Sequence, residues 1–528
     1  MGPTANTGHP RRWTILGVLV VSLLVVVLDN TVLNVAMRTI ADPRQGLGAS
    51  QSQLEWSINS YTLVFAGLLF TAGVLGDRYG RRAVLLAGLA LFGLASLASA
   101  YAQDPNQLIA ARAIMGIGGA AVLPATLSII SNVFDPRERG RAIGVWAGSV
   151  GLAVAIGPVV GGLLLEHYWW GSVFLINVPI VVFGIVAVLA LVPESRDPKP
   201  GRVDVVGVLM SIAGLAALVY GVIDGGDHGF GRPSSWGSIA GGLVVLAAFV
   251  AYERRIPFPS LDVRLFANPR FSASVAAVGL VFFAAMGTFF FLSFYLQLVR
   301  GLSPLQAGLL MTPFAVAQMV FAPGSSAMVR RFGPKAVSAV GMLVTAAVMA
   351  GFGLVTPTTP MWAIAALFFF NGVGLANVMP PATESIMSSV PREKAGVGSA
   401  VGNTIRQVGG ALGVAVLGSA LSAVYRNSIA GDLTGLPAAA RSAAGESIAG
   451  GYAVAGRLGG AAGGAIARAA DSAFVHAMHY AAMGSAVVAV VGAVVVLVWL
   501  PRQSAPHTAP APAPVETLGE RLELAEAA

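Results

Sequence analysis

The sequence predicts an all-α membrane protein, and its composition and its recurring apolar segments lead to this prediction. Of the 528 residues, 56% are hydrophobic and 11% are charged, and the mean hydropathy is +0.76. Soluble domains carry roughly 25% charged residues, so a water-soluble chain of this composition could not bury its apolar surface. The absence of cysteine excludes disulfides, thiol nucleophiles and thiolate metal sites. The basic pI does not indicate nucleic-acid binding, because the Lys and Arg residues are scattered over many short loops.

Apolar segments of about spanning length predict fourteen transmembrane helices. The segments cover residues 13–37, 54–76, 83–103, 106–133, 142–165, 171–192, 204–224, 235–252, 270–299, 304–328, 335–356, 361–389, 396–425 and 473–500. The seventh and eighth are short and rich in glycine. The first is too long for the core of a signal peptide, so we expect it to remain in the protein.

The distribution of basic residues predicts the orientation of these spans. An even number of spans places both termini on one side of the membrane, and most of the 32 Lys and Arg fall in the loops on that side. Positive-inside bias therefore predicts that both termini are cytoplasmic. The predicted parts are a cytoplasmic N-terminus (1–12), an N-terminal six-helix bundle (13–192), an inserted helix pair with cytoplasmic connectors (193–269), a C-terminal six-helix bundle (270–500) and a flexible cytoplasmic tail (501–528).

A long extracellular loop is predicted at about 426–472, inside the C-terminal bundle. It is rich in Ala and Gly, and the sequence leaves open whether it forms a small helical hairpin or is partly disordered.

An internal repeat divides the chain into two related halves. The segment PATLSIIS at 124–131 matches PATESIMS at 381–388, and DRYGRRAV at 77–84 matches RRFGPKAV at 330–337. Both matches have about the same separation, and both sit at the cytoplasmic end of a predicted span. The repeat predicts two six-span halves with an inserted pair of helices, an arrangement typical of secondary transporters that bind substrate near the midplane between the halves.

Four segments resemble motifs of a known transporter family. The segment GVLGDRYGRRAVLLAG at 73–88 resembles the signature between the second and third spans of the major facilitator superfamily. LDNTVLNVA at 28–36, RAIMGIGGAA at 112–121 and GPVVGG at 157–162 are similar to motifs of its fourteen-span drug:proton antiporter branch, the EmrB/QacA type. The resemblance implies the major facilitator fold, with two six-helix bundles and two inserted helices.

The signature segment implies a cytoplasmic gate. We expect Asp77 to pair with an arginine or to cap the following helix, and Gly80 to permit a tight turn. Simple positive-inside topology is the alternative interpretation of its arginines. The gate residues are predicted to be Gly73, Asp77, Arg78, Gly80, Arg81 and Arg82.

Asp29 and Arg112 are two charges inside apolar spans. A carboxylate this deep costs about 2.5–3.5 kcal/mol on the insertion scale, and such residues usually face a bundle interior or a wet cavity. Because the two residues lie at similar depths, we expect them to face each other within the N-terminal half. The family resemblance implies that both relay protons; a static pair that only helps folding is the alternative. Asn34 lies on a neighbouring face of the first span and is either a polar cavity contact or an interhelical hydrogen bond.

Glu384 and Arg406 form a second candidate pair, since they flank the short loop between the twelfth and thirteenth spans. Equal depth predicts that they lie within reach of one another. Either they form a structural ion pair, or they take part in coupling or substrate contact.

The glycines of the fifth span predict close helix packing and a bend. In the family that this chain resembles, the same segment is associated with antiport, although Ala153 here departs conservatively from the pattern. The residues of this packing motif are Gly157, Pro158, Gly161 and Gly162.

Apolar and aromatic side chains are predicted to line a central cavity, with packing as the alternative for most of them. The candidates are Tyr61, Phe65, Phe290, Phe294, Tyr295, Gln318, Phe370 and Asn371. Gln318 stands in the tenth span, where related pumps use acids to handle divalent cations, so we do not expect a dedicated dication pump.

These features predict a proton-coupled exporter of lipophilic drugs, antibiotics or related small molecules that works by alternating access. A proton-independent lipid or metabolite exporter on the same fold is the alternative. We expect no enzyme activity, no cofactor apart from protons as coupling ion, no bound metal and no nucleic-acid partner. The predicted form is a monomer in the lipid bilayer of a bacterial plasma membrane.

Overall fold

The computed structural model describes residues 9–196, 204–257, 259, 261–389 and 395–500; for part of the first half of α5 and the start of α13 it describes only the backbone. No strand occurs in these residues, in agreement with the predicted all-α class. The predicted tail 501–528 and most of the N-terminal segment 1–12 lie outside the described residues.

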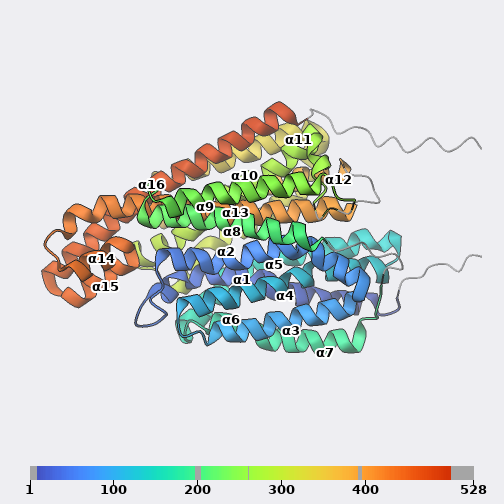
Figure 1. Cartoon of the computed structure of the whole chain (residues 1–528), viewed down its shortest axis with the longest axis horizontal. Helices are drawn as coiled ribbons and strands as arrows, with labels where there is room; N and C mark the ends of the chain where they lie inside the picture. The colour runs from blue at the N-terminus through green and yellow to red at the C-terminus, as the bar shows by residue number, and fades with distance from the viewer. Residues whose placement is uncertain (1–8, 197–203, 258, 260, 390–394, 501–528) are drawn as a thin grey trace, which may run out of the picture.

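The N-terminal half is a bundle of seven helical segments, drawn in blue to teal in Figure 1. They are α1 (Arg12–Ala41), α2 (Gln51–Tyr79), α3 (Arg81–Ala100), α4 (Pro105–Val133), α5 (Pro136–His167), the short α6 (Ser172–Leu175) and α7 (Asn177–Leu191).

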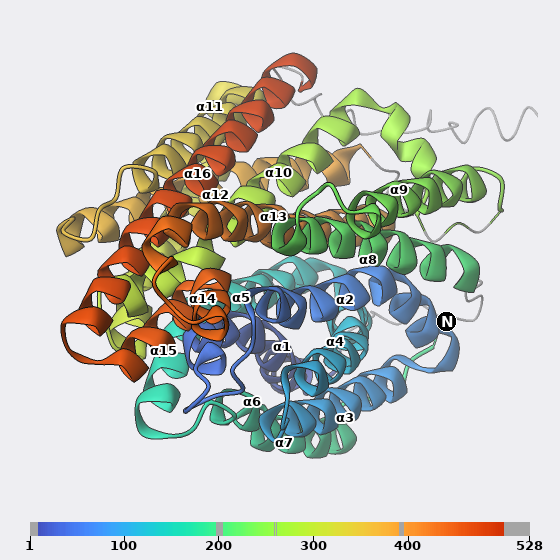
Figure 2. The same cartoon turned by 60° about the vertical axis from the view of Figure 1, so that its left-hand side comes forward.

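The C-terminal half lies beside it and follows two intervening helices (Figures 1 and 2). The intervening helices are α8 (Val205–His228) and α9 (Pro233–Glu253). The half itself contains η1 (Val263–Ala267), α10 (Pro269–Phe294), η2 (Tyr295–Val299), α11 (Pro304–Phe352), α12 (Met361–Ser388), α13 (Ala395–Ile429), η4 (Ala430–Leu433), α14 (Ala438–Glu446), α15 (Ile448–Leu458) and α16 (Gly460–Trp499).

The predicted long loop contains the two short helices α14 and α15, which project at one end of the molecule in Figure 1. We call this end the hairpin end. Helix α16 has 40 residues, about 60 Å at 1.5 Å per residue, whereas a bilayer core is about 30 Å thick. Its first turns therefore extend beyond the membrane toward α14 and α15. Helix α1 begins, and α16 ends, at the opposite end.

The described residues contain twelve helices long and apolar enough to cross a membrane, or thirteen if the bent helix α2 counts as one span. The two parts of α2, Gln51–Leu69 and Thr71–Tyr79, meet at 52°. In α5 only the shorter segment Ile156–His167 qualifies as an apolar helix. The structure therefore does not reach the predicted fourteen spans: α2 is bent, and the described apolar part of α5 is too short to cross alone.

The internal repeat extends to local geometry. Helix α2 begins with a capping box in which the Ser50 hydroxyl accepts from the Gln53 N–H (3.3 Å) and the Gln53 side chain accepts from the Ser50 N–H (3.0 Å). Helix α11 begins in the same way, with distances of 3.2 Å and 3.0 Å between Ser303 and Gln306. Such boxes satisfy backbone donors that the first turn of a helix leaves free.

Both repeated segments contain a glycine with a positive φ angle. Gly80 separates α2 from α3 with φ 114°, and Gly333 interrupts the long helix α11 with φ 81°. Glycine adopts this region readily because it lacks a Cβ atom. The two turns occupy matching places in the repeated segments 77–84 and 330–337.

The two halves touch in the middle and toward the hairpin end. There the Ser293 hydroxyl donates to the Asn34 carbonyl (2.6 Å), and the Gln297 side chain donates to the Val35 carbonyl (2.9 Å). Helix α8 packs in the same interface, because its residues share one buried apolar cluster with α2 and α13. The buried members of that cluster are Leu63, Val219, Ile223, Ala411 and Ala415.

Candidate functional site

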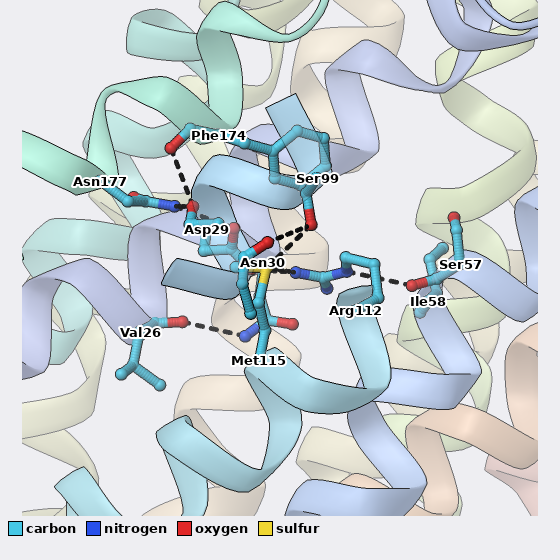
Figure 3. Close-up of polar contacts among 12 residues, drawn as sticks. Val26, Asp29, Asn30, Ser57, Ile58, Ser99, Arg112, Met115, Phe174 and Asn177 are labelled. Atoms are coloured by element: carbon cyan, nitrogen blue, oxygen red, sulfur yellow. Dashed lines mark hydrogen bonds and ion pairs between the residues drawn. The ribbon is translucent and has the colours of Figure 1, made fainter. Parts of the chain in front are cut away.

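Asp29 and Arg112 form an ion pair inside the N-terminal half, as their depth in the sequence predicts (Figure 3). Asp29 lies in the middle of α1 and Arg112 in the first third of α4. Both side chains are fully inaccessible to solvent. A buried ion pair is tolerated only when further hydrogen bonds satisfy its remaining polar atoms. The surroundings of the pair supply several of these.

Two neighbouring helices hold the pair in place. The Arg112 Nε donates to the Ser57 carbonyl of α2 (3.1 Å), and the Asn177 side chain of α7 donates to Asp29 (3.1 Å). The Asn177 amide also lies 3.0 Å from the Ser96 hydroxyl, which itself donates to the Phe174 carbonyl (2.9 Å). Five helices of the N-terminal half, α1, α2, α3, α4 and α7, and the short α6 therefore contribute to the hydrogen-bond network around one carboxylate.

Aromatic rings complete the cage around the guanidinium. The Arg112 guanidinium lies 4.4 Å from the ring centre of Tyr61 and 5.9 Å from that of Phe174. Arg112 Nη2 is buried and makes no hydrogen bond within the described residues. Its charge is therefore balanced by a single carboxylate and by the faces of these rings. A change in the charge of Asp29 would leave this cation without a counter-ion.

Tyr61 and Phe65 are packing residues of this cage and do not line an open cavity. They are buried, and their rings stack at 5.6 Å. Gly116 and Gly119 of α4 make room for them, since a Cβ at Gly119 would lie 2.9 Å from the Tyr61 hydroxyl. The aromatic character of these residues led to the cavity prediction, but the small residues opposite them close the space.

The other predicted cavity residues are mostly buried as well. Phe290, Phe294 and Tyr295 are at most 2% exposed, and the Tyr295 hydroxyl donates to the Thr356 carbonyl (2.7 Å). Asn371 is fully buried, and its amide has no hydrogen-bond partner within the described residues. Gln318 is half-buried. Of the predicted aromatic residues only Phe370 is exposed, at 51%.

Asn34 serves as a contact between helices. Its side chain donates to the Asn30 carbonyl one turn earlier (3.1 Å), and its own carbonyl accepts the Ser293 hydroxyl of the other half. The hydrogen bond of Asn34 to the other half thus uses its backbone, whereas its side chain bonds within α1.

The signature segment forms a tight turn between α2 and α3. Asp77 pairs with Arg81 one helical turn later, at 2.8 Å. Arg82 Nη1 donates to the Val192 carbonyl (3.3 Å). Arg78 is exposed and lies over the ring of Tyr79. A Cβ at Gly73 would make only an ordinary contact with Pro124.

Glu194 caps α3, a role that the sequence analysis did not assign to it. Its carboxylate accepts the backbone N–H groups of Arg82 (3.1 Å) and Ala83 (3.2 Å). The same carboxylate lies against Gly80, where a Cβ atom would be 2.7 Å away. Gly80 is thus required both by its φ angle and by the carboxylate that approaches it. No local sequence signal links Glu194 to a turn so far away along the chain.

The glycines of α5 bring it against two helices. A Cβ at Gly157 would collide with the Thr31 side chain of α1, and one at Gly161 would lie 2.9 Å from Val32. A Cβ at Gly162 would lie 2.5 Å from the backbone of Leu305 in α11. Pro158 lies inside the helix. The predicted close packing is therefore present, and it joins α5 to both halves.

Glu384 and Arg406 do not form the predicted ion pair in the described structure. Glu384 is exposed on α12, whereas the Arg406 guanidinium on α13 lies 5.7 Å from the ring centre of Phe282 on α10. Equal depth predicts only that two residues share a level in the membrane. It does not specify the helix face on which each lies, and here the faces differ.

Glu55 is a buried acid at the contact between the halves that the sequence analysis did not single out. It is 1% exposed on α2, and its carboxylate lies against Gly418 of α13. Nearby, Arg426 approaches Asp227 of α8 at 3.8 Å. The sequence signal that could have identified Glu55 is an acid in the first turns of an apolar helix.

No group of three or more acidic or His residues that could hold a metal lies in the described part of the chain.

Comparison with known sequences gives a consistent picture. Residues 19–414 match the family model described as Major Facilitator Superfamily. The chain is 38% identical to the multidrug efflux pump LfrA of Mycolicibacterium smegmatis, over 86% of this chain and 90% of that protein. It is 36% identical to the tetracenomycin C resistance and export protein of Streptomyces glaucescens, over 77% and 76% of the two chains. It is 34% identical to the methyl viologen resistance protein SmvA of Salmonella typhimurium, over 79% and 84%.

Solved structures share the fold at low sequence identity. A bacterial homolog of the human lysosomal transporter Spinster, crystallised in an inward-facing and unoccupied conformation, superimposes with a TM-score of 0.66. That match has 17% identity and covers 94% of this chain and 99% of the other. A POT family transporter in complex with 5-aminolevulinic acid gives a TM-score of 0.61 at 13% identity, over 92% and 96% of the chains.

Proposed function

Because the chain belongs to the major facilitator superfamily, we propose that it is a proton-coupled antiporter that exports lipophilic drugs, antibiotics or related small molecules. It is a multi-pass membrane transporter and not an enzyme. Relatives named for multidrug efflux, for tetracenomycin C resistance and export and for methyl viologen resistance support the substrate class. We further propose that the protein works as a monomer in a bacterial plasma membrane. Protons are its coupling ion, and it uses no other cofactor.

The proposed topology is the fourteen-span, EmrB/QacA type, with both termini in the cytoplasm. It adds the bent helix α2 and the helix α5 to the twelve spans described above. The bias of Lys and Arg toward the loops on the side of the termini supports this orientation. In this topology the hairpin end faces the exterior.

The observation that carries the proposal is the buried pair of Asp29 and Arg112. A proton on Asp29 removes the negative charge that holds Arg112, so the two charge states favour different packings of α1 against α4. Because the pair is inaccessible in the present conformation, a proton can reach it only when the helices rearrange. Proton exchange and conformational change are then linked, as antiport requires.

Alternating access is supported by the distribution of contacts between the halves. The described hydrogen bonds between them lie in the middle and toward the hairpin end, for example those of Ser293 and Gln297 with α1. In the proposed orientation this conformation is closed to the exterior. Loading from the cytoplasm is followed by rocking of the halves, proton entry at Asp29 from outside and release of the substrate.

The test is transport into or out of proteoliposomes under an imposed pH gradient. Methyl viologen, puromycin and a lipophilic dye are the substrates, since related proteins carry resistance to the first two in their names. We expect concentrative transport by the parent and its loss in Asp29→Asn, with Asp432→Asn, an exposed carboxylate in η4, as the matched control. Undiminished concentrative transport by Asp29→Asn would overturn the assignment of the coupling residue.

The rival function, proton-independent export of a lipid or metabolite, gives a different result in the same vesicles. Movement of a fluorescent phospholipid that is insensitive to an uncoupler and to Asp29→Asn would favour it. Uncoupler-sensitive drug transport would exclude it.

A further inference from the structure

A cavity of about 320 Å³ at the hairpin end brings together three arginines from separate segments. This is the lower end of the size range of small-molecule sites and many times the volume of one water molecule. Arg38 and Arg44 come from the end of α1 and the loop that follows, and Arg457 comes from the last turn of α15. The remaining lining residues are Asp42, Pro43, Leu298, Ala449, Tyr452, Ala453 and Gly456.

The arginines are available to a ligand. Within the described part of the chain, none of the three guanidinium groups makes an ion pair or a hydrogen bond. Asp42 is the one acid among the lining residues, and its carboxylate accepts the backbone N–H groups of Arg44 (2.7 Å) and Gln45 (3.4 Å). The lining therefore carries two more positive than negative charges, and its acid is already engaged in a turn.

Tyr452 fixes the hairpin side of the cavity. Its hydroxyl lies 3.1 Å from the Leu298 carbonyl of η2 and 2.9 Å from the Asp471 carboxylate of α16. Burial raises the pKa of this hydroxyl, and Asp471 raises it further, while Arg38 acts in the opposite direction. Tyr452 therefore stays neutral and adds no negative charge opposite the arginines.

Stabilisation of helix ends is the simpler explanation for two of these arginines. Arg38 and Arg457 lie in the last turns of α1 and α15, where cations interact favourably with the helix dipole. That explanation accounts for neither Arg44, which lies in a loop, nor the convergence of all three side chains on one cavity.

We propose that this cavity binds one anionic oxygen group, a phosphate or a carboxylate, through Arg38, Arg44 and Arg457. Arginine suits such a group because its planar guanidinium can donate two parallel hydrogen bonds. The group can belong to a free anion or to the headgroup of an acidic lipid.

The bound anion would join parts of the molecule that must separate during transport. Arg38 and Arg44 belong to the N-terminal half, Arg457 to the hairpin, and Tyr452 ties that hairpin to the C-terminal half. An anion shared by these arginines therefore stabilises the conformation that is closed at the hairpin end. This inference concerns a site remote from Asp29 and holds whether or not transport is coupled to protons.

The experiment measures anion binding by thermal unfolding of the purified full-length protein. One arm titrates inorganic phosphate against chloride of equal ionic strength in detergent. The other compares nanodiscs of phosphatidylcholine with nanodiscs that also contain phosphatidylglycerol. A shift in the unfolding temperature with phosphate identifies a free anion as a ligand, and a shift with phosphatidylglycerol alone identifies a lipid headgroup; both results support the site.

Variants test the residues. We expect Arg38→Gln and Arg457→Gln each to weaken phosphate binding by about tenfold, the loss of one charge-assisted hydrogen bond. Arg457→Lys keeps the charge but not the two parallel hydrogen bonds, so it should bind more tightly than Arg457→Gln and more weakly than the parent, and it separates loss of charge from misfolding. Arg441→Gln, an exposed arginine on α14 outside the cavity, is the matched control and should bind as the parent does. No shift with either anion, or equal shifts in the parent and in the Arg38→Gln/Arg457→Gln double variant, would overturn the proposal.

Discussion

The guanidinium of Arg112 on α4 donates to the carboxylate of Asp29 on α1, and neither side chain has any surface open to solvent. Asn177 holds the other carboxylate oxygen, and the Ser57 carbonyl accepts from Arg112. Each partner is thus the main source of charge balance for the other. Loss of one partner is therefore expected to lower the free energy of unfolding more than loss of both.

Asp29→Asn is expected to lower the free energy of unfolding by about 3–5 kcal/mol, because it leaves the Arg112 charge buried without a counter-ion. Adding Arg112→Gln removes that charge and should restore a large part of the loss. Denaturation in detergent of the two single variants and the double variant measures this. If the double variant is as unstable as the sum of the singles, the two residues are not energetically coupled.

Glu194→Ala is expected to destabilise the turn between α2 and α3. It removes the acceptor for two backbone N–H groups at the start of α3, and the loss of a helix cap costs about 0.5–2 kcal/mol. Hydrogen exchange of the amides of Arg82 and Ala83 should accelerate. Glu166→Ala, which removes an exposed carboxylate from α5, is the control and should leave that exchange unchanged.

Gly157→Ala is expected to force α5 away from α1. The added methyl group meets the Thr31 side chain, and overpacking of this kind costs about 1–3 kcal/mol. We expect a lower unfolding temperature and slower transport. Gly17→Ala on α1 is the control, since a Cβ there meets nothing within 4 Å; equal effects of the two substitutions would contradict the packing role.

Glu384 and Arg406 are expected to behave as independent residues. Arg406→Gln loses the contact with the Phe282 ring, worth about 0.5–2 kcal/mol, whereas Glu384→Gln changes an exposed side chain and should have little effect on folding. The double variant should therefore equal the sum of the singles within about 0.5 kcal/mol. A charge swap that restores stability would show instead that the two side chains meet in another conformation.

Features that depend on position along the membrane normal could be predicted from the sequence. The depths of Asp29 and Arg112 in their spans were sufficient to predict their ion pair. Both residues lie in one half, and each charge needs a partner in apolar surroundings. The break at Gly333 and the turn at Gly80 follow from glycines in the repeated segments. In each case the relevant information is local, or is repeated within the chain.

Features that depend on rotation about a helix axis could not be predicted in the same way. Glu384 and Arg406 share a level but lie on different faces, and Tyr61 is buried because Gly119 faces it. The role of Asn177 depends on a contact with α1, which no pattern in its own segment specifies. The described structure departs from the predicted count of spans at α2, which is bent, and at α5, whose described apolar part is short.

The matching turns at Gly80 and Gly333 have a consequence for motion. Each joins two consecutive helices with no intervening loop, at the end of the molecule opposite the hairpin. Because a single residue links the two helices of each pair, we expect their adjoining ends to move together. We therefore expect displacement during transport to concentrate at the interface between the two halves, while each helix pair moves together around its glycine turn.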